Sequence, residues 1–165
     1  MPTFVVGLPL HPLIVHAVVV LVPLAALGAL VIAVWPAARR RFGWPVVACA
    51  VVATALIPVT IYAGEDLQSR LPSTDLIRRH ADLGGQLLPF AAGFLVVVLA
   101  FVWVGTRGSR DPSGDRQPPK AAMVVLGVLT VALAAVSVVQ VVRIGDSGAR
   151  AAWTGIEQLP KRPNG

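Results

Sequence analysis

Three histidines and two carboxylates, placed at the ends of apolar segments, are the residues of this 165-residue chain best suited to chemistry. His11 and His16 open the first apolar segment, and His80 precedes the third. Glu65 follows the second segment, and Asp146 follows the fourth. Imidazoles and carboxylates ligate zinc or copper, and two facing imidazoles can hold haem iron. The pattern predicts that His16 and His80 hold haem or a metal ion, with His11, Glu65 and Asp146 as further metal ligands or their hydrogen-bonding partners.

His16 is the most informative of these residues because it lies about one turn into an otherwise apolar stretch. A polar side chain is costly there and usually faces the interior of a helix bundle. Three interpretations stay open: structural hydrogen bonding, ligation of metal or haem, and proton handling. His11 precedes Pro12 and is expected at a helix entrance. Solvation at the membrane interface is the simplest alternative for the carboxylates Glu65, Asp66 and Asp146.

No known catalytic motif accompanies these residues. The sequence has no glycine-rich phosphate loop, HExxH, CxxC or serine nucleophile elbow, so an enzyme is not favoured. The single cysteine, Cys49, cannot form a disulfide within the chain. The net charge of +6 does not indicate nucleic acid, because the basic residues form short clusters between long apolar runs and do not alternate with aromatic residues.

Transmembrane helices are the elements that must position these side chains. Hydrophobic residues make up 56% of the chain and charged residues 13%, about half the share of a soluble domain. Nearly charge-free stretches predict four spans of about 20 residues, enough for a hydrocarbon core of about 30 Å: residues 13–35, 45–63, 85–105 and 121–142. The predicted fold class is an all-α integral membrane four-helix bundle over residues 1–145, with a short C-terminal tail at 146–165.

The basic residues predict the orientation of the bundle. Lys and Arg are equally numerous on the two sides, so the acid-free triplet Arg39–Arg41 in a predicted loop at 36–44 decides. The prediction places this loop and the linker 106–120 in the cytoplasm and both termini outside, in a bacterial inner membrane. Ser73 or Thr74 is expected to cap a helix that begins near Asp75.

A shared pattern in the first and third spans favours a tandem repeat of a two-helix unit. Leu21–Ala26 matches Leu87–Ala92, each with a proline as its third residue, and His16 and His80 precede them as candidate equivalents. The second and fourth spans end similarly, in Gly64–Glu65 and Gly145–Asp146. Two-helix units in tandem enter the membrane in the same direction, so their symmetry axis would lie along the membrane normal. Chance recurrence of common apolar residues is the alternative.

The segment Gly7–His16, with the sequence GLPLHPLIVH, resembles the opening motif of bacterial membrane proteins called domain-of-unknown-function family 2231. Members are similar to this chain in having four spans, a histidine before the third, here His80, and a Gly-polar-x-Gly turn after the fourth, here Gly145–Gly148. The resemblance covers nearly the whole chain. Two departures are a proline delayed to Pro23 and Asp146 where relatives commonly carry histidine. The family implies no established activity. The fusion of some relatives to Rieske or cytochrome c modules implies an association with redox proteins.

Three functional hypotheses follow. The first is a small accessory membrane protein that binds metal or haem at the outer-face histidine and carboxylate cluster beside a redox system. The second is a structural or assembly subunit, in which the small residues Ala25, Ala29 and Ala33 let other helices approach closely. A proton or ion pathway ranks last because the middles of the spans are nearly bare of polar groups. Ser137 and Gln140 are expected to make interhelical hydrogen bonds.

Overall fold

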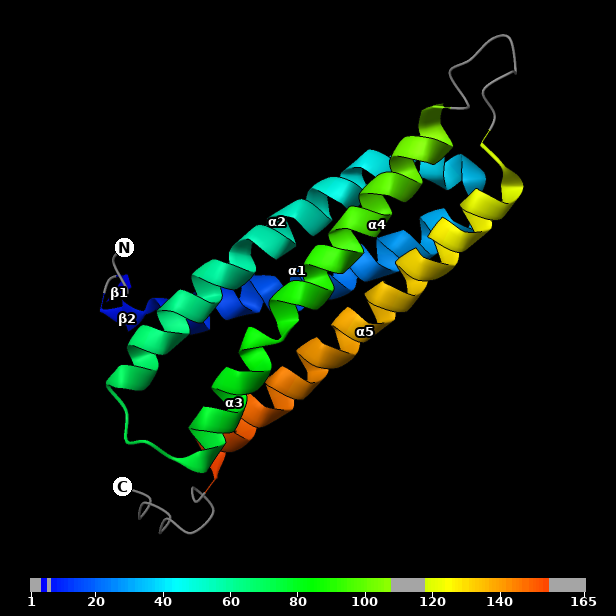
Figure 1. The fold of residues 1–165 in the computed structure, drawn as a ribbon. Helices are drawn as coiled ribbons and strands as arrows, with labels where there is room; N and C mark the ends of the chain where they lie inside the picture. Colours follow the sequence, from blue (N-terminus) through cyan, green and yellow to red (C-terminus); the bar gives the residue numbers. More distant parts are fainter. Residues whose placement is uncertain (1–3, 6, 108–117, 155–165) are drawn as a thin grey trace, which may run out of the picture.

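The computed structural model describes residues 4–5, 7–107 and 118–154 of the chain. Its elements are the strands β1 (Phe4–Val5) and β2 (Leu8–Pro9) and the helices α1 (Leu10–Val34), α2 (Pro36–Ser69), α3 (Asp75–Gly85), α4 (Leu87–Arg107) and α5 (Lys120–Trp153). Helices α1, α2, α4 and α5 run side by side as a bundle, and α3 precedes α4 at one end (Figure 1). Four helical segments, α3 and α4 counting as one, are long and apolar enough to cross a membrane. The fold is the predicted all-α four-helix membrane bundle.

A minimal hairpin leads into the bundle. β1 and β2 pair antiparallel, with Phe4 opposite Pro9 and Val5 opposite Leu8. Gly7 lies between them with a positive φ of 79°, a conformation that glycine adopts at little cost. The chain therefore turns back on itself just before α1 begins at Leu10.

The helices extend further than the predicted spans. α2 begins at Pro36, so the loop predicted at 36–44 is wrong and Trp35 alone joins α1 to α2. Proline suits the first turn of a helix, and arginine is a good helix former, which explains why this basic segment is helical. α5 continues to Trp153, so residues 146–153 of the predicted tail belong to a helix. Residues 155–165 of that tail, and 108–117 of the predicted linker, lie outside the described residues.

The third span enters through two helices rather than one. The Thr74 side chain caps α3 by accepting a hydrogen bond from the Ile77 backbone N–H at 3.3 Å, as predicted. Gln86 then separates α3 from α4. Pro89 lies in the first turn of α4, where its lack of an N–H removes a bond to the end of α3. This break separates the polar helix α3 from the apolar helix α4.

Small residues bring the helices into close contact in the core. Of the predicted packing stripe, Ala25 and Ala29 are 2% and 0% exposed, and Ala33 is partly buried against the same core. A Cβ on Gly28 would lie 2.7 Å from a methyl group of Val46, and one on Gly43 would lie 2.8 Å from a methyl group of Val102. Such close approach is the usual means of helix association in lipid, where apolar burial alone gives little advantage.

The two halves of the bundle, α1–α2 and α3–α5, bury equivalent positions. Residues 69 positions apart, the separation of His11 and His80, are buried together in the pairs Val18 and Leu87, Val22 and Ala91, Ala25 and Phe94, Ala29 and Val98, and Ile32 and Phe101. Residues 84 positions apart, the separation of Gly64 and Gly148, are buried together in the pairs Val46 and Thr130, Ala50 and Ala134, Ala53 and Ser137, Ile57 and Val141, and Ala63 and Ser147. This shared burial pattern is the one expected of a tandem repeat of a two-helix unit.

This register corrects the alignment expected from sequence. The matched prolines, Pro23 and Pro89, are 66 positions apart rather than 69, and the equivalent of Gly64 is Gly148 rather than Gly145. A shift of three residues is nearly one helical turn and keeps the same face, at about 3.6 residues per turn. Matching of apolar motifs alone therefore could not separate the two registers.

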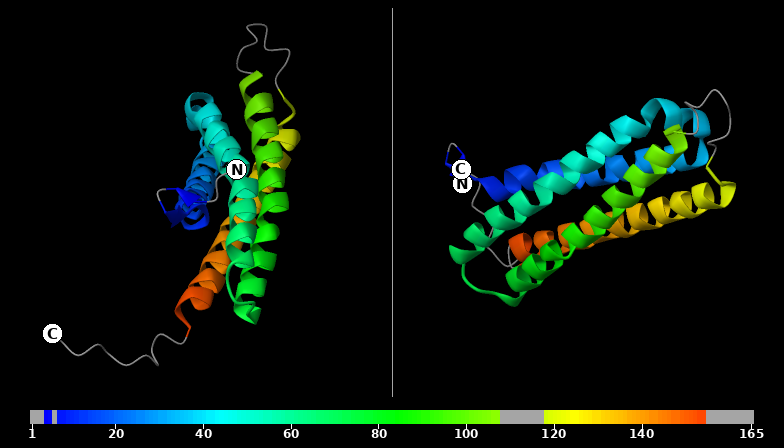
Figure 2. Two further views of the ribbon diagram at one scale, coloured as in Figure 1. Left: turned by 90° about the vertical axis from the view of Figure 1, so that its left-hand side faces the viewer. Right: turned by 45° about the horizontal axis from the view of Figure 1, so that its top comes forward.

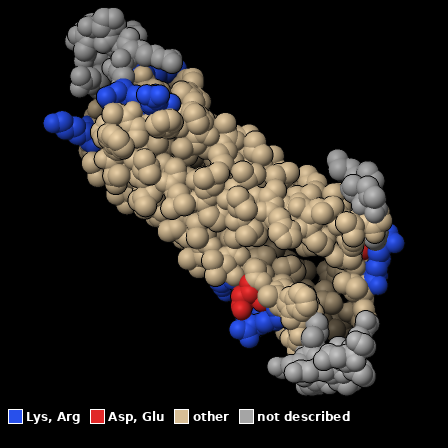
Figure 3. All heavy atoms as spheres, turned by 180° about the vertical axis from the view of Figure 1, so that it is seen from behind, with Lys and Arg blue, Asp and Glu red and all other residues tan. Residues whose placement is uncertain are grey.

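Charged residues gather at the two ends of the bundle (Figure 3). We call the end that carries Arg39–Arg41 the arginine end and the end that carries His11 and His80 the histidine end. The hairpin of β1 and β2 and the last turns of α5 lie at the histidine end (Figures 1 and 2). Trp44 and Trp103 meet near the arginine end, with ring centroids 6.3 Å apart. Tryptophan is enriched at membrane–water interfaces.

Candidate functional site

Two histidines, one from each half of the repeat, meet at the histidine end. His11 is the second residue of α1, and His80 lies in the middle of α3. Their ring centroids are 6.2 Å apart and their planes are nearly perpendicular, at 84°. Both rings are partly buried. The structure thus brings together two of the predicted site residues, which are 69 positions apart in the sequence.

A glycine on α2 receives the ring of His11. The Nδ1 atom of His11 donates to the backbone carbonyl of Thr60 at 2.9 Å. A Cβ on Gly64, one turn further along α2, would lie only 2.9 Å from the same nitrogen. The missing side chain therefore exposes the backbone of α2, and the imidazole of the neighbouring helix can reach its carbonyl.

His80 makes the equivalent contacts with α5. Its Nδ1 lies 3.2 Å from the carbonyl of Ile144 and 3.1 Å from the hydroxyl of Ser147. The Ser147 hydroxyl donates to the Ile144 carbonyl at 2.8 Å, so its oxygen is left to accept from the imidazole. A Cβ on Gly148 would lie 2.9 Å from Cε1 of His80. Thr60 precedes Gly64 by four positions, and Ile144 precedes Gly148 by four, so the two halves bind their histidines in the same way.

These contacts determine which nitrogen of each ring carries the proton. A carbonyl oxygen only accepts, so the proton of each neutral imidazole is on Nδ1. Nε2 then carries a lone pair, and no described residue offers it a hydrogen bond. Histidines that ligate metals commonly anchor one ring nitrogen on a carbonyl and present the other to the ion.

His16 does not belong to this pair. Its side chain is exposed, and its Nδ1 donates to the carbonyl of Pro12 within the same helix. The prediction that His16 faces the bundle interior as the equivalent of His80 is therefore wrong. Five residues separate it from His11, which turns it about 140° around the helix at about 3.6 residues per turn.

The predicted carboxylates lie apart from the histidine pair. Glu65 is exposed, and Asp146 is exposed in an ion pair with Arg150 at 3.0 Å. Asp66 forms a similar pair with Arg70 at 3.0 Å. Within the described ranges, no three of the histidine, cysteine, aspartate and glutamate side chains are close enough to hold a metal ion together. The five-residue ligand set is therefore reduced to its pair of imidazoles.

Sequence reasoning missed the groups that orient the two rings. Two are backbone carbonyls, which no residue type reveals, and Gly64 and Gly148 act through the absence of a side chain. The sequence signal that could have revealed them is a glycine near the end of a helix whose neighbouring helix carries a histidine. Ser147, the remaining partner of His80, lies in the Gly-polar-x-Gly segment.

The side-chain hydrogen bonds of polar groups deeper in the bundle stay within single helices. Thr60, Thr130 and Ser137 each donate to the carbonyl four residues earlier, at 2.7–2.8 Å. Gln140 accepts from Arg143 of the same helix at 2.9 Å. The prediction that Ser137 and Gln140 make interhelical hydrogen bonds is therefore wrong.

Comparison with known proteins identifies the family of the chain. The family model described as "Predicted membrane protein (DUF2231)" matches residues 7–156. No curated protein and no solved structure matches the chain. The matched region begins before His11 and ends after Gly148, so it includes the histidine pair and the groups that orient it.

Proposed function

The chain belongs to domain-of-unknown-function family 2231, a family of predicted membrane proteins, and from this premise we propose an accessory membrane protein that holds a zinc or copper ion between His11 and His80 beside a membrane redox system. One observation carries the proposal. Both Nδ1 atoms are anchored on backbone carbonyls, so that both Nε2 atoms keep a lone pair. The redox setting rests on the family resemblance.

The separation of the two rings supports a shared ion. Imidazole nitrogen binds zinc at about 2.0–2.1 Å, which places two rings on opposite sides of one ion with centroids about 6 Å apart. The observed separation is 6.2 Å. Two protein ligands leave coordination positions for water or for a group from a partner subunit, as in sites that exchange ligands. Imidazole is a suitable ligand for both zinc and copper.

A single ion fits the site better than haem does. His16, which was expected to hold haem iron with His80, is exposed and turned away from the pair. The rings of His11 and His80 are packed against Gly64 and Gly148, and a single ion requires far less space beside them than a haem does. Haem bound between His11 and His80 would instead give a Soret band in the purified protein.

A structural subunit is the competing function, and the same contacts support it. The His11 contact joins α1 to α2, and the His80 contact joins α3 to α5. Substitution with asparagine separates the two functions. Its amide N–H can replace the Nδ1 donor, but its carbonyl oxygen is a far weaker ligand for zinc or copper than the Nε2 nitrogen of imidazole. If the pair is only structural, asparagine should preserve everything that the histidine does.

The test is metal analysis and calorimetric titration of zinc and copper on purified protein. We expect one ion per chain in the wild type and none in His11→Asn or His80→Asn, while both variants keep the wild-type melting temperature. His16→Asn is the matched control and should bind as the wild type does. Wild-type protein that binds neither ion, or loss of binding in His16→Asn, would rule out the proposed site.

The orientation and compartment are part of the same proposal. The Arg39–Arg41 triplet favours a cytoplasmic arginine end, which places the histidine pair and both termini on the outer side of a bacterial inner membrane. An ion site there would face the compartment in which extracytoplasmic redox modules operate.

A further inference from the structure

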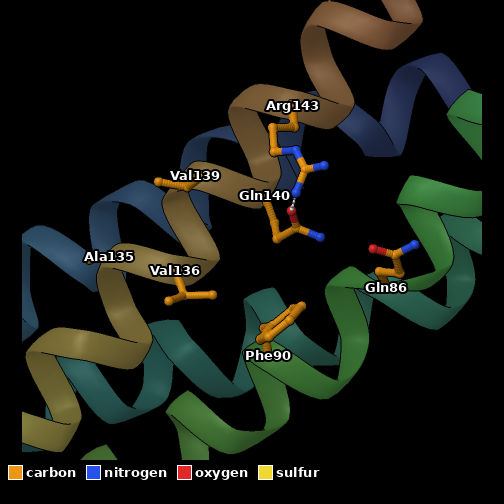
Figure 4. A pocket seen from close by; sticks show the side chains of 7 residues that line it. All are labelled: Gln86, Phe90, Ala135, Val136, Val139, Gln140 and Arg143. Carbon is orange, nitrogen blue, oxygen red and sulfur yellow. Dashed lines mark hydrogen bonds between the residues drawn. The ribbon is translucent and has the colours of Figure 1, made fainter.

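A groove on the side of the bundle lies between α4 and α5 near the histidine end (Figure 4). Its volume is about 320 Å³. Phe90, Ala135, Val136 and Val139 form an apolar floor. Gln86, Gln140 and Arg143 form a polar end. The groove thus matches an amphiphilic ligand, whose apolar chain would lie on the floor and whose polar head group would lie at the polar end.

The polar end presents donors of hydrogen bonds. Gln140 is 4% exposed and reaches from α5 towards α4 (Figure 4). Its carbonyl oxygen accepts from Arg143 at 2.9 Å, which leaves the amide NH₂ and the remaining guanidinium N–H groups as donors. Gln86 adds a second amide from the opposite side. These groups together favour a ligand that carries several acceptor oxygens.

The charge of Arg143 is not neutralised within the described part of the chain. At the same end of the bundle, Arg70, Arg78 and Arg150 each pair with an aspartate. Arg143 instead contacts only the neutral amide of Gln140, and none of the groove-lining residues is acidic. An anionic head group would supply the missing charge, whereas a neutral quinone carbonyl would not.

The position of the groove places it against lipid. Val136 and Val139 on its floor are 41% and 56% exposed on a helix that crosses the membrane. Arg143 directly follows the charge-free stretch 121–142, where the hydrocarbon region gives way to head groups. An acyl chain on the floor would therefore carry its phosphate to the level of the guanidinium.

We propose that this groove binds an anionic phospholipid, with the phosphate at Arg143, Gln140 and Gln86 and an acyl chain along Phe90, Val136 and Val139. The site is separate from the histidine pair and does not depend on a bound metal ion. Charge-assisted hydrogen bonds from a guanidinium hold phosphate oxygens well, and the apolar floor adds contact along the chain.

Native mass spectrometry of protein in micelles that contain phosphatidylglycerol and phosphatidylcholine in equal amounts tests the proposal. We expect the wild type to retain one phosphatidylglycerol tightly. In Arg143→Gln, the preference of the protein for phosphatidylglycerol over phosphatidylcholine should fall by about tenfold. Val139→Trp, which fills the groove, should retain neither lipid. Arg150→Gln, an exposed arginine of the same helix, is the matched control and should behave as the wild type.

Three results would overturn the proposal. They are an unchanged lipid preference in Arg143→Gln, unchanged retention in Val139→Trp, and retention from native membranes of a molecule without phosphorus, such as an isoprenoid quinone. Helical circular dichroism and a single elution peak establish that each variant is folded. Val139→Trp decides the question if Arg143→Gln does not fold, because it leaves the charge intact.

Discussion

The imidazole of His80 rests on α5 at Gly148, where a Cβ would come within 2.9 Å of its Cε1 atom. The contact between helices is therefore possible only because residue 148 has no side chain. His11 stands in the same relation to Gly64 on α2. Each half of the bundle thus depends on one glycine to seat one histidine.

Alanine at these glycines should displace the rings. We expect Gly148→Ala to lower the free energy of unfolding by about 1–3 kcal/mol, since the added methyl group overlaps a packed ring. Gly145→Ala is the control: a Cβ there meets nothing within 4 Å, and alanine is the better helix former by about 1 kcal/mol. Unfolding in mixed detergent micelles measures both. Equal stability of the two variants would contradict the contact.

The Ser147 hydroxyl should matter less than the histidine it contacts. In Ser147→Ala the Nδ1 of His80 still has the Ile144 carbonyl as acceptor, at 3.2 Å. We expect a loss of about 0.6 kcal/mol, the average that double-mutant cycles give for interhelical hydrogen bonds in one membrane protein. The same unfolding assay measures it. A loss as large as that of Gly148→Ala would mean that the hydroxyl, not the carbonyl, holds the ring.

The sequence predicted the bundle well because its signals are local. Long charge-free stretches predict spans, and Thr74 before Asp75 predicts a cap, whatever the rest of the chain does. The site could not be predicted in the same way, because it depends on which face of a helix turns towards the bundle interior. The sequence pattern does not specify that face when the whole span is apolar. The sequence favoured His16 as the partner of His80, and only the packing on Gly64 identifies His11 instead.

Phe101 should be among the most sensitive core positions. It is 1% exposed, and the guanidinium carbon of Arg39 lies 4.7 Å from its ring centroid. We expect Phe101→Ala to lower the free energy of unfolding by about 3–5 kcal/mol, because it leaves a cavity and removes the surface on which the arginine rests. Phe42→Ala removes a 51% exposed ring and should cost far less. Comparable losses in the two variants would place Phe101 outside the core.

Cysteine labelling in intact cells should reveal the orientation. In a Cys49→Ser background, Pro72→Cys at the histidine end should react with a membrane-impermeant maleimide, whereas Arg40→Cys at the arginine end should react only after lysis. Both positions are exposed at the ends of the bundle. The physical reason is retention of the arginine triplet on the cytoplasmic side. The reverse labelling pattern would invert the proposed topology.

The repeat has a consequence for the evolutionary origin of the chain. A unit of two spans returns to the side from which it started, so a second copy joined to the first inserts in the same direction. A single-unit ancestor could therefore associate with itself as a parallel homodimer and later be fused without change of topology. In that homodimer His11 and His80 would be one residue facing its own copy, and an ion between them would lie on the twofold axis.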